Sequence, residues 1–307
     1  MRVFEVGDSV FLLRFLPDGR RLVIGTMAAD EAVTFAVLLL PGGERVRLDV
    51  PNAKIHSWRY DAWCGNAIAV HPSGESCYIA WGGRLHAFRT ADGKALTVPK
   101  DMRANVNQVA LSPNGDRLLA ADRRRTGRLL WAVTTGRRGG RVEWFKVLDE
   151  QFSQLAGFLP DGERFVTIED VVRIRSFATN AELTVGEHKP VGSQQPQISP
   201  DGRLLAAIGY GNLYFWDLTT LDEPQRISGS SNFGDARSFA FHPNGKTVAV
   251  IHGGPTLVQV YDLGTLTQVH QWSWGLGPLR SVAYSPDGTV AAAGSEDGRI
   301  VVWDADE

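Results

Sequence analysis

The side chains in this chain that could carry out acid–base or metal chemistry are a scattered set of histidines and carboxylates. His56, His188 and His252 fall in segments that also hold carboxylates, namely Asp61, Glu169, Asp170, Asp235 and Glu296. Imidazole and carboxylate groups brought together can exchange protons or ligate a metal. Their spacing matches no catalytic pattern, and the chain has no phosphate-binding glycine loop, no His-Glu-x-x-His and no Cys-x-x-Cys. We therefore expect no enzyme, no cofactor and no metal site.

A second group of residues is better suited to binding than to chemistry. The segment 51–66 is unusually rich in the residue types that dominate protein interfaces, and its candidates are Trp58, Arg59, Tyr60 and Trp63. Trp81, which precedes two glycines, and Trp274 are candidates for the same surface. The alternative is that such rings fill gaps between neighbouring structural units instead of meeting a partner.

Basic residues gather in the middle of the chain. Between positions 117 and 146 there are nine basic and two acidic residues, a net charge of +7. Arg123, Arg124 and Arg125 form its densest run, and they are candidates for docking an acidic protein segment. Nucleic-acid binding is the alternative. The formal charge of the whole chain, −2, does not favour it, because nucleic-acid binding relies on excess positive charge.

Composition indicates a globular protein of a reducing compartment. At 307 residues with 43% hydrophobic residues, the chain can bury a large core. Two cysteines, Cys64 and Cys77, are too few for a secreted disulfide scaffold. The first residues lack the apolar stretch of a signal peptide, and the apolar run 35–40 is too short to cross a bilayer. We expect a cytoplasmic protein that does not bind membranes.

The elements that must position these residues come from a repeat. A phrase of the form apolar-x-Pro-Asp/Asn/Ser-Gly recurs seven times, at residues 15–19, 70–74, 111–115, 158–162, 198–202, 241–245 and 284–288. The intervals between its prolines are 55, 41, 47, 40, 43 and 43 residues. Proline pre-sets φ for a turn and glycine accepts positive φ, so each phrase predicts a β-hairpin. The short apolar runs that follow, such as 118–121, suit strands covered on both faces.

An aromatic residue follows each turn after 16 to 18 positions in six of the units: Phe88, Trp131, Phe177, Trp216, Tyr261 and Trp303. A further turn and strand come next, so each unit predicts four strands. The long first interval indicates an insertion in the first unit. The last unit has room for only three strands, and we expect residues 2–6 to supply its fourth, leaving no exposed sheet edge.

These features resemble the WD-repeat β-propeller family, most clearly where Ser-Pro-Asp-Gly is followed by Trp216-Asp217 and Trp303-Asp304. The resemblance implies an all-β fold: one closed seven-bladed β-propeller of four-stranded antiparallel blades over residues 1–307, with the N-terminal strand completing the last blade. The family's Gly-His pair is not evident. The seventh unit keeps Ser295, Asp297 and Trp303 but lacks the histidine that would link them, so we expect the usual buried hydrogen-bond chain to be missing.

The resemblance also implies a function. It predicts a non-catalytic scaffold that binds protein or peptide partners, acidic ones among them, through loops on one face, and that acts as a monomer or within a larger complex. That face, the top face, carries the loops from each fourth strand to the next first strand and from each second strand to the third. The alternatives are a propeller enzyme or small-ligand or metal binder using the central channel, and a nucleic-acid binder using the basic third unit.

Overall fold

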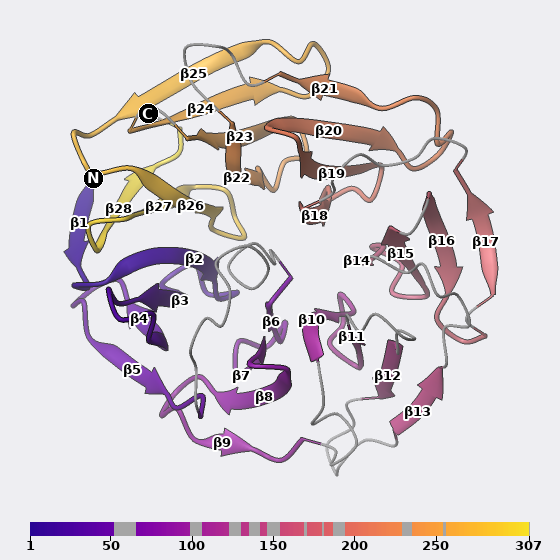
Figure 1. The fold of residues 1–307 in the computed structure, drawn as a ribbon, viewed down its shortest axis with the longest axis horizontal. Coiled ribbons are helices and arrows are strands. Elements are labelled where there is room, and N and C mark those ends of the chain that lie inside the picture. The colour runs from indigo at the N-terminus through magenta and orange to yellow at the C-terminus, as the bar shows by residue number, and fades with distance from the viewer. Residues whose placement is uncertain are drawn as a thin grey trace.

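The structure is a computed structural model, and it describes residues 1–51, 66–98, 106–122, 130–134, 142–145, 154–168, 171–179, 181–186, 194–228, 235–253 and 256–306. The described strands form seven separate four-stranded antiparallel sheets, the blades, arranged around a common axis (Figure 1). Among the described residues there is no helix of the length and apolar character needed to span a membrane.

The first three blades follow one another along the chain. Blade 1 consists of β2 (Ser9–Phe15), β3 (Arg21–Met27), β4 (Val33–Leu39) and β5 (Arg45–Leu48). Blade 2 consists of β6 (Ile68–Val70), β7 (Ser76–Trp81), β8 (Arg84–Arg89) and β9 (Ala95–Leu96). Blade 3 consists of β10 (Val106–Leu111), β11 (Arg117–Asp122), β12 (Leu130–Thr134) and β13 (Val142–Phe145).

The next three blades repeat this arrangement. Blade 4 consists of β14 (Gln154–Phe158), β15 (Arg164–Ile168), β16 (Val172–Ser176) and β17 (Glu182–Val185). Blade 5 consists of β18 (Gln194–Ile198), β19 (Leu204–Gly209), β20 (Asn212–Asp217) and β21 (Gln225–Ile227). Blade 6 consists of β22 (Ala236–Phe241), β23 (Thr247–His252), β24 (Leu257–Asp262) and β25 (Gln268–Ser273).

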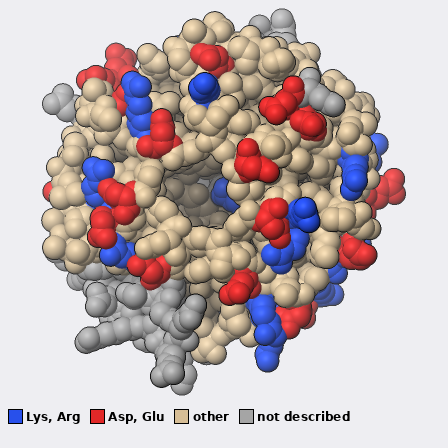
Figure 2. Space-filling view, turned by 180° about the vertical axis from the view of Figure 1, so that it is seen from behind, with Lys and Arg blue, Asp and Glu red and all other residues tan. Residues whose placement is uncertain are grey.

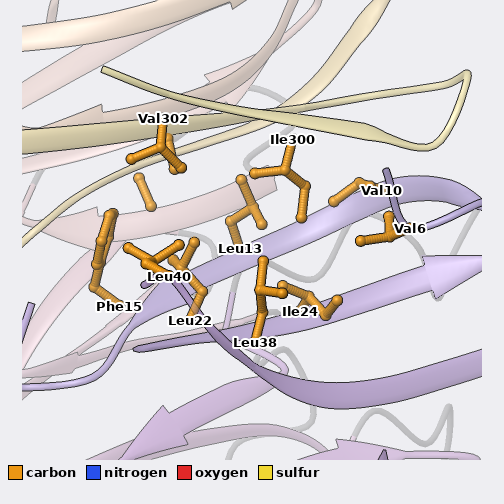
Figure 3. Packing of buried hydrophobic residues seen from close by; sticks show 12 residues of the cluster. Val6, Val10, Leu13, Phe15, Leu22, Ile24, Leu38, Leu40, Ile300 and Val302 are labelled. Carbon is orange, nitrogen blue, oxygen red and sulfur yellow. The ribbon is translucent and has the colours of Figure 1, made fainter. Parts of the chain in front are cut away.

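The remaining sheet, blade 7, combines the two ends of the chain. Its strands β26 (Leu279–Tyr284), β27 (Val290–Ser295) and β28 (Arg299–Asp304) are joined by β1 (Arg2–Glu5). β1 pairs antiparallel with β28, from Arg2 opposite Val302 to Glu5 opposite Arg299. Val6 then packs into a cluster shared by blades 7 and 1, beside Val10 and Ile300 (Figure 3).

The expectation of a closed ring without sheet edges is wrong. Six blades are made of four consecutive strands, one sheet is a composite of both chain ends, and no sheet among the described strands closes on itself. Each sheet therefore keeps two edges. The outer strands β17 and β25 are exposed along nearly their whole length. Pairing of β1 with β28 joins the chain ends within one blade, but hydrogen bonds do not run from blade to blade as they do in a barrel.

Side-chain packing between blades holds the ring together. The second strands are buried on both faces, and Ala206, Ala207 and Leu205 are all fully inaccessible. Small residues there let neighbouring sheets approach closely, as the short apolar runs predicted. Bulky buried rings, such as Trp216 of β20 and Phe239 of β22, belong to the hydrophobic clusters between neighbouring blades.

The hairpin turns form a collar at the opposite face, the bottom face. In each turn the glycine N–H donates to the carbonyl of the residue before the proline, as from Gly288 to Ser285 at 2.9 Å. All seven turn glycines have positive φ, between 65° and 77°. Each glycine faces the turn of the preceding blade, and Gly19 faces Ser285, so the collar continues from blade 7 to blade 1.

Two histidines are part of this collar, as their place before the proline predicted. His71 Nδ1 accepts from the backbone N–H of Ser73 at 3.1 Å, and His242 Nδ1 accepts from that of Asn244 at 3.1 Å. They stand at the position that serine occupies in other blades, where the Ser285 hydroxyl accepts from the backbone N–H of Val290 at 3.0 Å.

Candidate interaction surface on the top face

Most of the aromatic and arginine candidates lie outside the described residues. This applies to Trp58, Arg59, Tyr60 and Trp63 in the connection from β5 to β6, and to Arg123, Arg124 and Arg125 after β11. Their partner-binding role stays a prediction. The insertion expected in the first unit maps to the same long connection between β5 and β6.

Trp81 is described, and its ring is buried. It ends β7 with 4% of its surface exposed, and its ring centroid lies 5.5 Å from that of Phe11 and 5.4 Å from that of Phe35. The ring therefore fills the gap between blades 1 and 2, which leaves it little surface to offer a partner. This is the gap-filling alternative that the sequence left open for rings next to the top-face loops.

Trp274 lies in the loop from β25 to β26 and is only partly buried. Its ring packs on Trp303 of blade 7, with centroids 4.5 Å apart, and Trp272 covers the same ring at 5.5 Å. Trp274 thus anchors the loop to blade 7 and keeps one part of its ring accessible on the top face.

The hydrogen-bond chain typical of the family is incomplete in blade 7, as the missing histidine predicted. The Ser295 hydroxyl donates to Asp297, but the buried indole N–H of Trp303 finds no acceptor among the described residues. Aromatic packing by Trp272 and Trp274 takes the place of that link.

An ion-pair cluster joins blades 6 and 7 at the top end of their first strands. Glu296, in the loop from β27 to β28, contacts two guanidinium groups through the same oxygen. Nη1 of Arg237 lies 3.4 Å from Oε1 of Glu296, and Nη2 of Arg280 also meets this oxygen. Partial burial lowers the pKa of Arg280, and the Glu296 carboxylate partly offsets this. Two cations share one anion, so the cluster carries a net positive charge.

Tyr210 is the most exposed large side chain near this cluster, with 80% of its surface accessible. It lies in the two-residue turn from β19 to β20 with φ of 44°. The N–H of Ala236 donates to the Gly211 carbonyl at 2.8 Å, which ties this turn to the start of blade 6. The sequence analysis did not include Tyr210 among its candidates. Its signal is a tyrosine between two glycines at a turn on the top face.

We call the set Tyr210, Arg237, Trp274, Arg280 and Glu296 the blade 5–7 rim. A backbone hydrogen bond links the turn of Tyr210 to the start of blade 6, and ion pairs link Arg237 of blade 6 to Glu296 and Arg280 of blade 7. The N–H of Gly277 donates to Asp297 at 3.1 Å, which holds the Trp274 loop against the loop of Glu296. The rim combines exposed aromatic surface with arginine, which is the composition of a protein-binding patch.

The residues considered for acid–base or metal chemistry do not assemble within the described part of the chain. His252 is buried in β23, 2% exposed, with its ring 6.5 Å from that of Tyr261. Glu296 is engaged with two arginines. His56, Asp61, Glu169, Asp170 and His188 lie outside the described residues. No group of three or more metal-binding side chains occurs among the described residues.

Comparisons with known proteins agree with this architecture. The family model "WD domain, G-beta repeat" matches residues 267–304, which run from the outer strand of blade 6 to the end of β28. A crystal structure of the Myceliophteria thermophila Cps50 (Swd1) β-propeller domain superposes with a TM-score of 0.73. It covers 99% of this chain and 98% of that domain at 16% sequence identity, so the likeness concerns the fold alone.

Curated relatives match over part of the chain. Serine-threonine kinase receptor-associated protein of Gallus gallus is 30% identical over 105 residues, 34% of this chain and 29% of that protein. The Homo sapiens protein of that name is 28% identical over 137 residues, 44% of this chain and 37% of that protein. An uncharacterized WD repeat-containing protein of Synechocystis is 26% identical over 140 residues, 44% of this chain and 39% of that protein. The matches thus span well under half of these relatives.

The match of residues 267–304 to the repeat model, a relative that carries WD repeats and the shared propeller fold show that this chain resembles the WD-repeat β-propeller family.

Proposed function

We propose that this chain is a non-catalytic scaffold that binds a protein or peptide partner through its top face. Propellers of its family generally mediate protein–protein interactions, which supports the general role. The observation that carries the proposal is the blade 5–7 rim. There the turn with the exposed Tyr210 is hydrogen-bonded to the start of β22, the strand of Arg237, and Arg237 shares Glu296 with Arg280.

The chemistry of the rim favours an acidic or polar partner segment. Arginine pairs with carboxylates in a bidentate way, and tyrosine adds contact area at a low cost in conformational entropy. The predicted aromatic loop with Trp58, Tyr60 and Trp63 and the predicted arginine run 123–125 would extend the same face around the axis.

A cytoplasmic location is part of this proposal and rests on the cysteines. Cys77 is buried, and burial raises its pKa to about 12, which fits an unreactive thiol.

The test is affinity capture from native lysate with four proteins. These are the wild type, a rim variant (Tyr210→Ala with Trp274→Ala), a loop variant (Trp58→Ala with Tyr60→Ala and Trp63→Ala) and a control variant. The control, Leu183→Ala with Val185→Ala, removes apolar surface from the outer strand β17, where these residues are 52% and 44% exposed. Each variant must melt cooperatively before it is compared.

We expect at least one partner that the wild type and the control variant retain and that the rim or loop variant loses at least tenfold, measured by quantitative mass spectrometry. Equal retention by all four proteins would contradict a top-face site. A wild type that retains no partner would contradict the scaffold role.

A further inference from the structure

Two cavities lie along the axis of the propeller, and one arginine lines both. The first, of about 310 Å³, is bounded by the inner strands of blades 1, 5, 6 and 7. The second, of about 430 Å³, is bounded by those of blades 1, 2 and 3. Arg14 of β2 belongs to both sets of lining residues. Figure 2 shows one face of the disc hollowed at its centre, with a basic side chain inside the hollow.

The register of the inner strands explains why a long side chain fits there. Arg14 stands three residues before the turn proline of blade 1. The same position holds Ala69 and Ala110 around the second cavity, and Ala240, Ala283 and Gln197 around the first. Since four of these five neighbours are alanine, the axis has room for one guanidinium and for a small molecule beside it.

The described lining of the two cavities mixes apolar and polar side chains. Among the described residues that line the two cavities, no other carries a charge. The polar side chains there act mainly as links between blades: Gln195 donates to the Arg237 carbonyl and Gln197 to the Phe239 carbonyl, both at 3.1 Å. Ser281 likewise donates to the carbonyl of Val10 at 3.1 Å. Arg14 is therefore the charged group among the described residues that line the axis.

An arginine in this position retains its charge, because guanidinium stays protonated in proteins. Enclosure by protein lowers the pKa of Arg14, which reflects the cost of removing its charge from bulk water. The guanidinium has several N–H donors in one plane, so a contact to the protein leaves others to hold an oxyanion. The volumes of the cavities are in the range of sites for small molecules.

We propose that the axial cavities form a binding site for a small molecule that carries a phosphate or carboxylate group, with Arg14 as its anion-binding residue. The site is separate from the blade 5–7 rim. Loss of anion binding in the axial cavities would leave partner binding at the rim in place, and the reverse also holds. The two proposals can therefore fail independently.

The test uses inorganic phosphate and citrate as probes, which distinguish the two kinds of oxyanion. Binding to the full chain is followed by titration calorimetry and by the melting temperature, with sodium chloride added to keep the ionic strength constant. We expect saturable binding of one of the probes. At a concentration about ten times the Kd, linkage predicts a rise in Tm of about 2–4 °C for a domain of this size.

Arg14→Gln removes the charge at the axis and should abolish binding. Arg20→Gln is the matched control, because it removes the same charge from an exposed position just after the same turn. Arg14→Lys keeps the charge without the planar pair of donors and should bind at least tenfold more weakly. It also serves as the test if the glutamine variant does not melt cooperatively.

Equal binding by Arg14→Gln and the wild type would overturn the proposal. So would the absence of any wild-type response beyond that to sodium chloride, or an equal loss in Arg20→Gln.

Discussion

Gly202 of blade 5 lies directly against Pro160 of blade 4. A Cβ atom at position 202 would clash with the Pro160 Cδ atom. The φ of Gly202 is 75°, a region that residues with a side chain rarely adopt. This position is therefore under two constraints, one from the turn itself and one from the neighbouring blade.

Gly202→Ala should lower the free energy of unfolding by about 2–5 kcal/mol. Positive φ accounts for about 1–2 kcal/mol and overpacking against Pro160 for about 1–3 kcal/mol. Urea denaturation followed by circular dichroism measures the change. Gly82→Ala separates the two causes, because Gly82 has φ of 58° and no atom within 4 Å of the added Cβ. A loss of the same size in both variants would show that contact between the turns contributes nothing.

Removal of residues 1–6 should lower the melting temperature by far more than an ordinary terminal trim. The deletion takes away β1, which pairs with β28, and Val6, whose side chain packs between blades 7 and 1. It also removes the hydrogen bond from the Val6 N–H to the Gly298 carbonyl. Differential scanning calorimetry measures the effect, and deletion of residues 306 and 307 is the control. An unchanged Tm would show that β1 does not stabilise the ring.

Asp297 should make the stability of blade 7 depend on pH below about pH 5. Hydrogen bonds from Arg299, supported by the Ser295 hydroxyl and the Gly277 N–H, lower its pKa to about 2. The folded state thus binds this proton less tightly than the unfolded state. The stabilisation is complete above the unfolded pKa and is lost as the pH falls from about 4 towards 2.

Asp297→Asn should therefore be less stable than the wild type at pH 7, and the difference should shrink as the pH falls from about 5 to about 2. Since about a third of the side chain is exposed, solvent screening reduces the expected difference to about 1 kcal/mol. Urea titrations at several pH values measure it. A difference that stays constant down to pH 2 would contradict this role for Asp297.

Glu296 should couple energetically to Arg280. Glu296→Gln leaves the half-buried guanidinium of Arg280 without its counter-charge, which should cost about 1–3 kcal/mol. The double variant with Arg280→Gln should recover part of that loss, because the unpaired charge is gone. A double-mutant cycle of unfolding free energies measures the coupling. Purely additive effects would show that the ion pair adds no net stability.

Part of this structure can be predicted from short stretches of the sequence. Proline, Asp or Asn and glycine set the dihedral angles of the hairpin turns, so residues 198–202 and their counterparts specify turns wherever they occur. The placement of His71 and His242 in those turns followed from their position before proline. Runs of small apolar residues such as 204–207 likewise predicted strands covered on both faces. Each of these inferences depends on neighbours in the chain alone.

Other properties depend on residues far apart in sequence. Trp81 and Tyr210 both stand at turns on the top face, yet the first is enclosed by Phe11 and Phe35 of blade 1 and the second projects into solvent. Whether a ring is covered depends on the shape of the gap beside it, which the adjacent blade creates. The edges that each blade retains follow in the same way from how the sheets stack.

The sequence by itself determined the repeat, the turns and the strands, because these arise from backbone preferences over a few residues. Only the tertiary structure decided which side chains meet: Arg237 and Arg280 at Glu296, Gly202 at Pro160, and Arg14 at the axis. These residues lie far apart in the chain or in different blades. Their distances are set by packing of whole sheets, which no local pattern encodes.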